Sequence, residues 1–282
     1  MSFCREDNAM PGASRRKMLI RAGLVLIPGL VLILMMLPLP AEAGSALPRG
    51  FVYLRDIDPT IVQDIRYAGS HNFVGRPIRG YLAAECILSD RAATALKTVQ
   101  SLLAEKNLSL IVWDCYRPQR AVDDFWQWSR DPAQTEMKAE FYPRTDKREL
   151  FALGYLATRS RHSQGSTVDL GLVPNTFAWP PKPARSQGLK ACNLPKGERF
   201  EDGTVDLGTG YDCLDVAGNT SNASVGEVAL RNRQTLKSTM QRAGFRSYAR
   251  EWWHFELVDE PYHHGFDFEV SVPPSSDRPS AR

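Results

Sequence analysis

The sequence has little of several features that mark specialised proteins. Histidine and cysteine occur five times each in 282 residues, and no two cysteines are spaced Cys-x-x-Cys, so a four-cysteine zinc site is not expected. Charge of one sign is also lacking, since 35 Lys and Arg face 32 Asp and Glu, and net charge therefore predicts no nucleic-acid partner. With 43% hydrophobic residues and no internal repeat, the composition is that of a globular protein.

The first 43 residues are expected to be a targeting segment. Four basic residues between positions 15 and 21 precede an apolar run that begins near residue 23 and ends in a small-x-small pattern. This is the layout of a secretory signal peptide, with a paired arginine that resembles a twin-arginine signal. The run is shorter than the ~20 apolar residues of a membrane span, and Pro28 interrupts it. An inner-membrane anchor over 23–40 is the alternative, and both interpretations predict a periplasmic or otherwise exported protein.

The four cysteines beyond that segment are expected to form disulfides, because an exported protein folds in an oxidising compartment. Cys192 and Cys213 flank one segment rich in proline and glycine, which favours a bridge between them. Cys86–Cys115 is the second expected pair. Four buried free thiols are the alternative.

Apolar periodicity predicts both helices and strands along the chain. The expected fold class is α+β, as one compact domain over 44–270 with a central and mainly antiparallel sheet flanked by helices. Ser89 is a good N-cap, and Ala92, Leu96, Val99 and Leu103 form one apolar stripe after it. The expected helices are 89–105, one that begins at Pro118, and 226–243, and the expected strands are 108–112, 166–173 and 255–258.

Two segments are expected to lie outside this regular structure. Residues 174–210 contain five prolines and several glycines, and chemistry-bearing segments lie on both sides, so they are interpreted as an inserted loop. The proline-rich residues 271–282 are expected to be a disordered tail.

Two of the histidines lie in segments that suggest chemistry. The first is Ser-Arg-His-Ser-Gln-Gly-Ser-Thr-Val-Asp over 160–169, in which Gly165 allows a turn that brings His162 and Asp169 together. The second is Glu-Trp-Trp-His-Phe-Glu over 251–256. Glu251 and His254 would face opposite sides of a flat strand, so both reach one point only if a turn or bulge lies between them, just before the strand.

Together these residues predict a catalytic zinc site, which is expected to lie on the sheet. His162, Asp169 and His254 supply two imidazoles and one carboxylate, and they leave a fourth tetrahedral position for water. Glu251 would be the general base that takes the proton of that water. Arg117, in Asp-Cys-Tyr-Arg-Pro, would stabilise the oxyanion, although it could instead be a structural partner of Asp114.

Three motifs in this order resemble the D-alanyl-D-alanine dipeptidases, a family of zinc peptidases related to the vancomycin-resistance dipeptidase. They are Asp-x-Tyr-Arg-Pro, Ser-x-His-x-x-Gly-x-x-x-Asp and Glu-x-x-His, and the resemblance covers roughly residues 50–265. It implies one zinc ion per chain, held by the three ligands above, with Glu251 as base and Arg117 as transition-state stabiliser. It further implies that Asp212 receives the substrate ammonium and that Ser160 and Tyr67 contact the substrate.

The expected function is therefore zinc-dependent hydrolysis of D-alanyl-D-alanine to two D-alanines, in turnover or scavenging of cell-wall peptides. The expected partner is a small D,D-dipeptide, and a membrane only if the N-terminal segment stays uncleaved. A zinc carboxypeptidase acting on longer peptidoglycan stem peptides is one alternative. A non-catalytic module that binds peptidoglycan peptides is another, although Glu251 and Arg117 argue against it.

Overall fold

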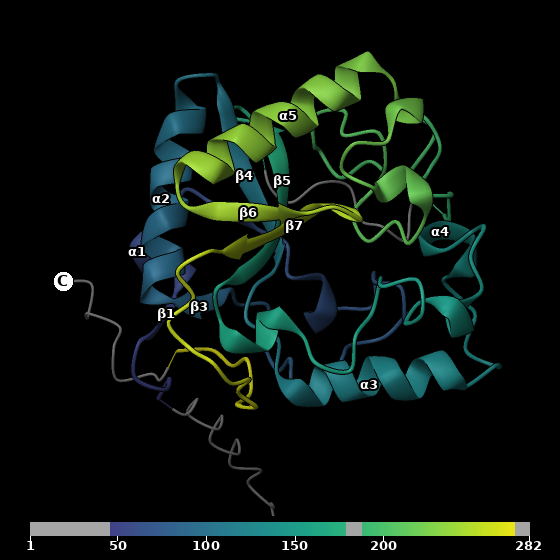
Figure 1. Cartoon of the computed structure of the whole chain (residues 1–282), viewed down its shortest axis with the longest axis horizontal. Coiled ribbons are helices and arrows are strands. Elements are labelled where there is room, and N and C mark those ends of the chain that lie inside the picture. The colour runs from purple at the N-terminus through teal and green to yellow at the C-terminus, as the bar shows by residue number, and fades with distance from the viewer. Residues whose placement is uncertain (1–45, 179–187, 274–282) are drawn as a thin grey trace, which may run out of the picture. The chain divides into compact units, whose positions relative to one another are not determined.

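The computed structural model describes residues 46–178 and 188–273 (Figure 1). The expected signal segment over 1–43 and most of the expected tail lie outside these residues. No helix in the described part of the chain is long and apolar enough to cross a membrane. The helices and strands in chain order are β1 (Phe51–Tyr53), α1 (Leu54–Ile57), β2 (Val62–Gln63), η1 (Arg66–Ala68), β3 (Ile87–Ser89), α2 (Asp90–Ala104), β4 (Leu108–Asp114), α3 (Gln119–Arg130), α4 (Lys138–Phe141), η2 (Lys147–Glu149), η3 (Arg161–Gln164), β5 (Thr167–Pro174), η5 (Val216–Gly218), η6 (Ala223–Val225), α5 (Glu227–Arg242), β6 (Phe245–Tyr248) and β7 (Glu251–Leu257).

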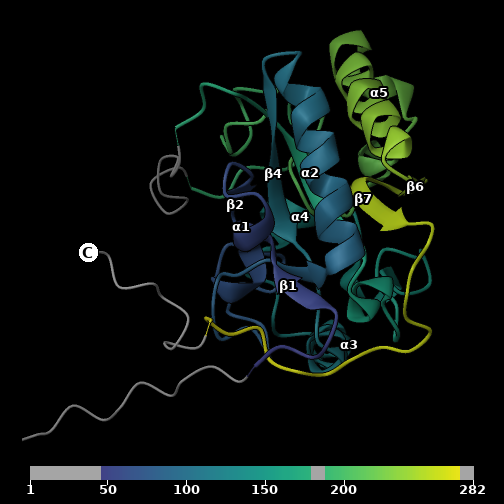
Figure 2. The same cartoon turned by 90° about the vertical axis from the view of Figure 1, so that its left-hand side faces the viewer.

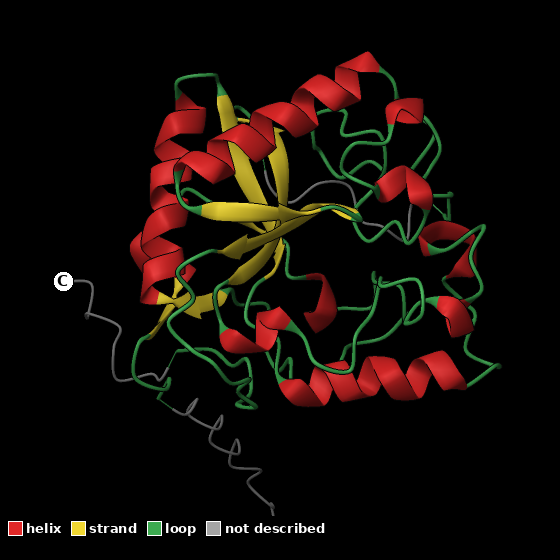
Figure 3. Ribbon diagram, viewed as in Figure 1, coloured by secondary structure: helices red, strands yellow, loops and turns green. Residues whose placement is uncertain are grey.

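A five-stranded sheet organises the fold, and its strands are drawn in yellow in Figure 3. The strand order is β2-β4-β5-β7-β6. Four of its strands pair antiparallel, and the short β2 adds a parallel pair to β4. Strands β1 and β3 form a separate antiparallel pair. The predicted α+β class and mainly antiparallel central sheet are confirmed.

Helices α2 and α5 contact each other and cover the same face of this sheet (Figure 2). The side chain of Ser89 caps α2 by accepting a hydrogen bond from the backbone of Ala92, as the sequence predicted. The four residues of the predicted apolar stripe are all fully buried. An amphipathic helix thus places one face against the sheet and leaves the other to solvent.

The last strand differs from the sequence prediction. Strand β7 begins at Glu251, four residues earlier than expected, so Glu251 and His254 belong to the same strand. The register against β6 shifts so that Ser247 pairs with Phe255 and Tyr248 pairs with Glu251. The irregularity expected just before the strand is therefore a bulge within it. A bulge turns a side chain out of strict alternation, so Glu251 and His254 can approach one another.

Two disulfides join the four cysteines, Cys86 to Cys115 and Cys192 to Cys213. The alternative of four free thiols is therefore wrong. Cys115 directly follows β4, so the first bridge ties the end of a central strand to the segment before β3. Within the expected inserted loop, the described residues 175–178 and 188–210 form no helix or strand, and the second bridge fastens this segment to Cys213.

Candidate active site

Three side chains converge where β5, β7 and η3 meet. Asp169 and His254 lie directly opposite each other in the β5–β7 pairing, and His162 approaches from η3. Gly165 ends η3 with a φ of 98°, the left-handed conformation that turns the chain from His162 into β5. All three belong to one cluster whose ligand atoms lie within 4.8 Å of one another.

This cluster fits a tetrahedral metal ion. The Nδ1 atom of His254 lies 3.1 Å from Oδ1 of Asp169 and 3.2 Å from Nε2 of His162, and the latter lies 3.3 Å from the same oxygen. Ligands about 2.1 Å from a tetrahedral zinc are roughly 3.4 Å from each other. Three ligand atoms that are this close, from two imidazoles and a carboxylate, leave a fourth position for water.

The second nitrogen of each imidazole has a partner of its own. His162 Nδ1 donates to the carbonyl oxygen of Cys115 at 2.8 Å, because a carbonyl can only accept. His254 Nε2 lies 3.5 Å from Oε1 of Glu256. Such contacts fix the ring orientation and keep the metal-facing nitrogen available.

Glu251 stands beside the cluster. Its Oε2 atom is 3.6 Å from Nδ1 of His254, and the residue is only 8% exposed. Burial raises the pKa of Glu251 to about 8, because a desolvated carboxylate is costly, while the nearby His254 partly opposes the shift. A carboxyl group in this setting can both accept and return a proton near neutral pH.

Arg117 combines the two roles that the sequence left open. Its guanidinium is 2.8 Å from Oδ2 of the fully buried Asp114 and 3.5 Å from Oδ2 of Asp169. It also lies over the rings of Tyr67 and Phe125, at 5.2 and 5.3 Å. Burial alone would lower the pKa of Arg117, but Asp114 raises it well above the ordinary value, so the group stays charged. The ion pair with Asp114 thus holds a permanent positive charge beside the cluster.

Asp212 forms a further buried acceptor. It has a φ of 55°, which few residues other than glycine adopt, and its Oδ2 accepts a hydrogen bond from the Tyr67 hydroxyl at 2.8 Å. Burial, with repulsion from Asp169, raises the pKa of Asp212 well above its ordinary value. A buried carboxyl with one hydroxyl partner is suited to receive a cationic group from a ligand.

All eight residues that the sequence singled out for metal, catalysis or substrate line the same cavity, which has a volume of about 150 Å³. Ser160 belongs to its wall and also caps η3 by accepting from the backbone of His162. The arrangement brings together a cluster that could hold a metal ion, a buried carboxyl beside it, a fixed cation and a second buried carboxyl. These are the components that metal-assisted hydrolysis of a small peptide needs.

Sequence reasoning missed two contributors. Glu256 faces His254 because residues two apart in a strand share a side, so strand alternation could have found it. The hydroxyl of Tyr211 lies 3.2 Å from Oδ2 of Asp169, and the Tyr211 ring stacks on Trp113. Tyr211 comes from the irregular segment before Asp212, and no local pattern indicates that contact.

Comparisons with known proteins all match the same family. The model of a family described as D-ala-D-ala dipeptidase matches residues 48–177 and 195–272. A D-alanyl-D-alanine dipeptidase of Enterococcus faecalis is 34% identical over 223 residues, which cover 79% of this chain and 98% of that protein. Proteins of the same name from Streptomyces coelicolor and Escherichia coli are 35% and 30% identical, over 78% and 73% of this chain and 98% and 83% of their own lengths.

Proposed function

The chain belongs to the D-ala-D-ala dipeptidase family and is a metallopeptidase, and from this premise we propose that it hydrolyses D-alanyl-D-alanine to two D-alanines with one zinc ion per chain. The observation that carries the proposal is the convergence of His162, Asp169 and His254 beside the buried Glu251. Two imidazoles and one carboxylate suit zinc and leave one position open.

Each residue of the site has a separate role in the proposed reaction. Bound zinc would lower the pKa of a water molecule to about 7 and polarise the scissile carbonyl. Glu251 takes the proton of the attacking water at a carboxylate oxygen and returns it to the leaving amine. Arg117, held by Asp114, presents positive charge where the tetrahedral oxyanion develops.

Asp212 and Tyr67 account for the choice of a dipeptide. Their hydrogen-bonded pair lies in the cavity wall, where a free ammonium group can form a charge-assisted hydrogen bond to the carboxyl. A substrate with an acylated amino terminus lacks that charge. An ammonium acceptor in the cavity wall therefore favours a dipeptidase over an enzyme that removes the last residue of long stem peptides.

We further propose that the protein is exported and acts on dipeptide released from the cell wall. The signal-like segment over 1–43 supports export, as do the two disulfides, because such bonds persist mainly in oxidising compartments. Turnover or scavenging of wall-derived dipeptide suits an exported enzyme. Extraction of the periplasm with alkylation of free thiols would test both the location and the bonds.

The test of the activity compares zinc-loaded protein on D-Ala-D-Ala, N-acetyl-D-Ala-D-Ala and an N-acylated stem peptide. We expect the free dipeptide to be preferred by about 10- to 100-fold in kcat/KM, because acylation removes a hydrogen bond to a charged group. Asp212→Asn should shrink that preference. Equal rates on the free and acetylated dipeptides would favour the carboxypeptidase, and no hydrolysis of any of them would contradict the proposal.

A further inference from the structure

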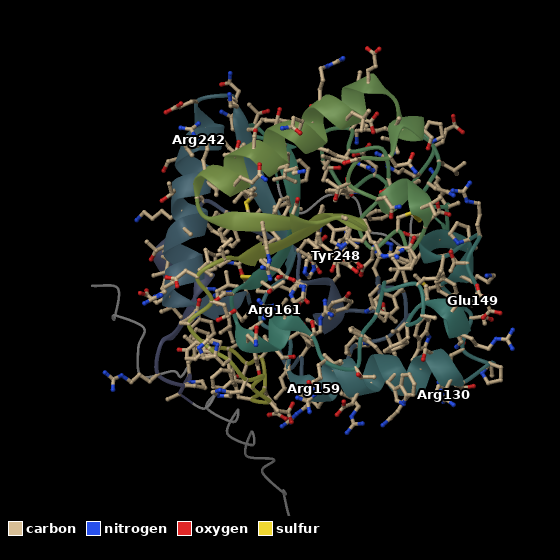
Figure 4. The ribbon with its side chains drawn as sticks, in the orientation of Figure 1. Arg130, Glu149, Arg159, Arg161, Arg242 and Tyr248 are labelled. Atoms are coloured by element: carbon tan, nitrogen blue, oxygen red, sulfur yellow. A yellow bond between two sulfur atoms is a disulfide. The ribbon has the colours of Figure 1, made fainter. Side chains whose placement is uncertain are left out.

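One wall of the active-site cavity carries two arginines that the mechanism above does not use. Arg159 and Arg161 flank Ser160 just before the candidate ligand His162, and both line the cavity with Tyr248 opposite (Figure 4). Arg159 is exposed and makes no hydrogen bond or ion pair with any residue that the structure describes. Two cations therefore stand at the cavity with their charge largely unneutralised.

Arg161 has one weak ion pair. Its Nε lies 3.5 Å from Oε2 of Glu256, but the same oxygen is already bound by Arg246 at 2.5 and 2.9 Å. Glu256 also faces His254 through its other oxygen. A carboxylate shared among three cationic or imidazole groups cannot neutralise Arg161, so this contact positions the guanidinium and leaves its remaining donors for a ligand.

A second cavity adjoins the first along the same segment. It has a volume of about 550 Å³ and shares Arg159, Ser160 and Arg161 with the active-site cavity. His263 and His264 add hydrogen-bonding groups to its wall, and none of the described residues that line it carries a carboxylate. The second cavity thus carries two arginines and no carboxylate among its described lining residues, whereas buried carboxyl groups line the active-site cavity.

The carboxyl groups of the cavity and the two arginines therefore differ in burial. Asp169, Asp212 and Glu251 line it together and are almost fully buried, whereas the arginines lie in exposed positions. A zwitterionic dipeptide has an ammonium at one end and a carboxylate at the other. With its ammonium at Asp212, its carboxylate would need a cation in the same cavity, and the exposed Arg159 and Arg161 line that cavity next to the candidate ligand His162.

We propose that Arg159 and Arg161 form a subsite for the C-terminal carboxylate of the substrate, which makes them determinants of specificity for a free carboxyl terminus. This proposal rests on the proposed dipeptidase function, because it places the ammonium end at Asp212. Guanidinium groups match a carboxylate in geometry and charge and keep their charge at every physiological pH. Since both arginines are partly solvated, each should contribute modestly.

The experiment measures binding without turnover. Zinc-loaded Glu251→Ala protein is titrated with D-Ala-D-Ala and with D-alanyl-D-alaninamide, whose carboxyl terminus is neutral. We expect the acid to bind at least about tenfold more tightly than the amide. Arg159→Gln or Arg161→Gln, added to the same protein, should lower the affinity for the acid about five- to tenfold and change the affinity for the amide little. The double substitution should bring the two affinities together.

A matched control separates this role from an indirect one through Glu256. Arg246→Gln removes a partner of Glu256 but lines neither cavity, so it should leave the acid-to-amide ratio unchanged. If the acid and the amide bind equally well, or if Arg246→Gln lowers the ratio as much as Arg161→Gln, the subsite is wrong. Hydrolysis by the unmutated protein is a separate readout, so a failure of the dipeptidase function would be seen independently.

Discussion

At the scale of single residues, the candidate site depends on groups that contact its residues but are not candidate metal ligands themselves. His162 is oriented by the carbonyl of Cys115, His254 by Glu256, and Arg117 by Asp114. Each partner fixes a side chain that would otherwise have several rotamers. The precision of the cluster therefore comes from contacts that a list of ligands omits.

The first prediction concerns Glu256. A hydrogen bond with His254, opposed by partial burial, lowers the pKa of Glu256 to about 2, so its carboxylate is ionised at neutral pH and supports the imidazole. Glu256→Ala should weaken zinc binding about 10- to 100-fold, and Glu256→Gln should recover part of the loss. Competition with a chromogenic chelator measures the affinity directly.

Glu269 offers the control for that measurement. It pairs with Arg120 at 2.9 Å in a half-exposed position and does not line the active-site cavity. Glu269→Ala should therefore leave zinc affinity unchanged. An unaltered affinity in Glu256→Ala as well would mean that the contact with His254 does not support the metal.

At the scale of elements, the site depends on two closely packed strands, β4 and β5, and on an aromatic ring beside them. Asp169 and Gly171 point to the same side of β5, and the Trp113 ring of β4 lies where a side chain at 171 would be. Trp113 stacks on Tyr211, whose hydroxyl approaches Asp169. Glycine at 171 thus lets a large ring support the carboxylate.

Gly171→Ala tests this packing. The added Cβ would lie 2.5 Å from Cη2 of Trp113, which is closer than carbon atoms approach in proteins, so the ring must move. We expect the free energy of unfolding to fall by about 1–3 kcal/mol, measured by urea denaturation. Gly69→Ala is the control, because an added Cβ there would lie 3.9 Å from the carbonyl oxygen of Arg66 and the φ of Gly69 is −116°. Equal stability of the two variants would show that Trp113 adjusts freely.

Local sequence patterns predicted the helices and strands better than they predicted strand register and long-range contacts. The stripe along α2, the cap at Ser89 and the strand that carries Asp169 follow from periodicity and side-chain chemistry. The bulge in β7 and the contact of Tyr211 with Asp169 depend on register and on residues 42 positions apart. Such contacts are selected by packing of the whole chain, which no short window of sequence contains.

At the scale of the whole molecule, the disulfides join the irregular segments to the regular core. Cys213 follows Asp212, and its partner Cys192 belongs to a segment without helix or strand among its described residues. Backbone hydrogen bonds from Gly210 to Cys192 and from Cys192 to Glu140 run alongside the bridge. Asp212, the proposed ammonium acceptor, is therefore held by a covalent link beside it.

Removal of this bridge is expected to affect stability and substrate binding together. The two cysteines are 21 residues apart, so Cys192→Ser/Cys213→Ser should lose about 3 kcal/mol of the free energy of unfolding. KM for the dipeptide should rise more than kcat falls, because the bridge adjoins Asp212, the proposed ammonium acceptor, and none of the three candidate metal ligands. Guanidinium denaturation and steady-state kinetics measure the two effects. An unchanged KM in a destabilised variant would limit the bridge to a structural role.

The double use of Cys115 has a consequence for the maturation of the protein. Its sulfur is bonded to Cys86, and its carbonyl oxygen holds the ring of His162. Before oxidation, no disulfide holds the segment that carries this carbonyl, so the imidazole is less well oriented. Metal uptake should therefore follow oxidation in time. If the chain is exported as proposed, it would stay inactive in a reducing cytoplasm and become active only after translocation.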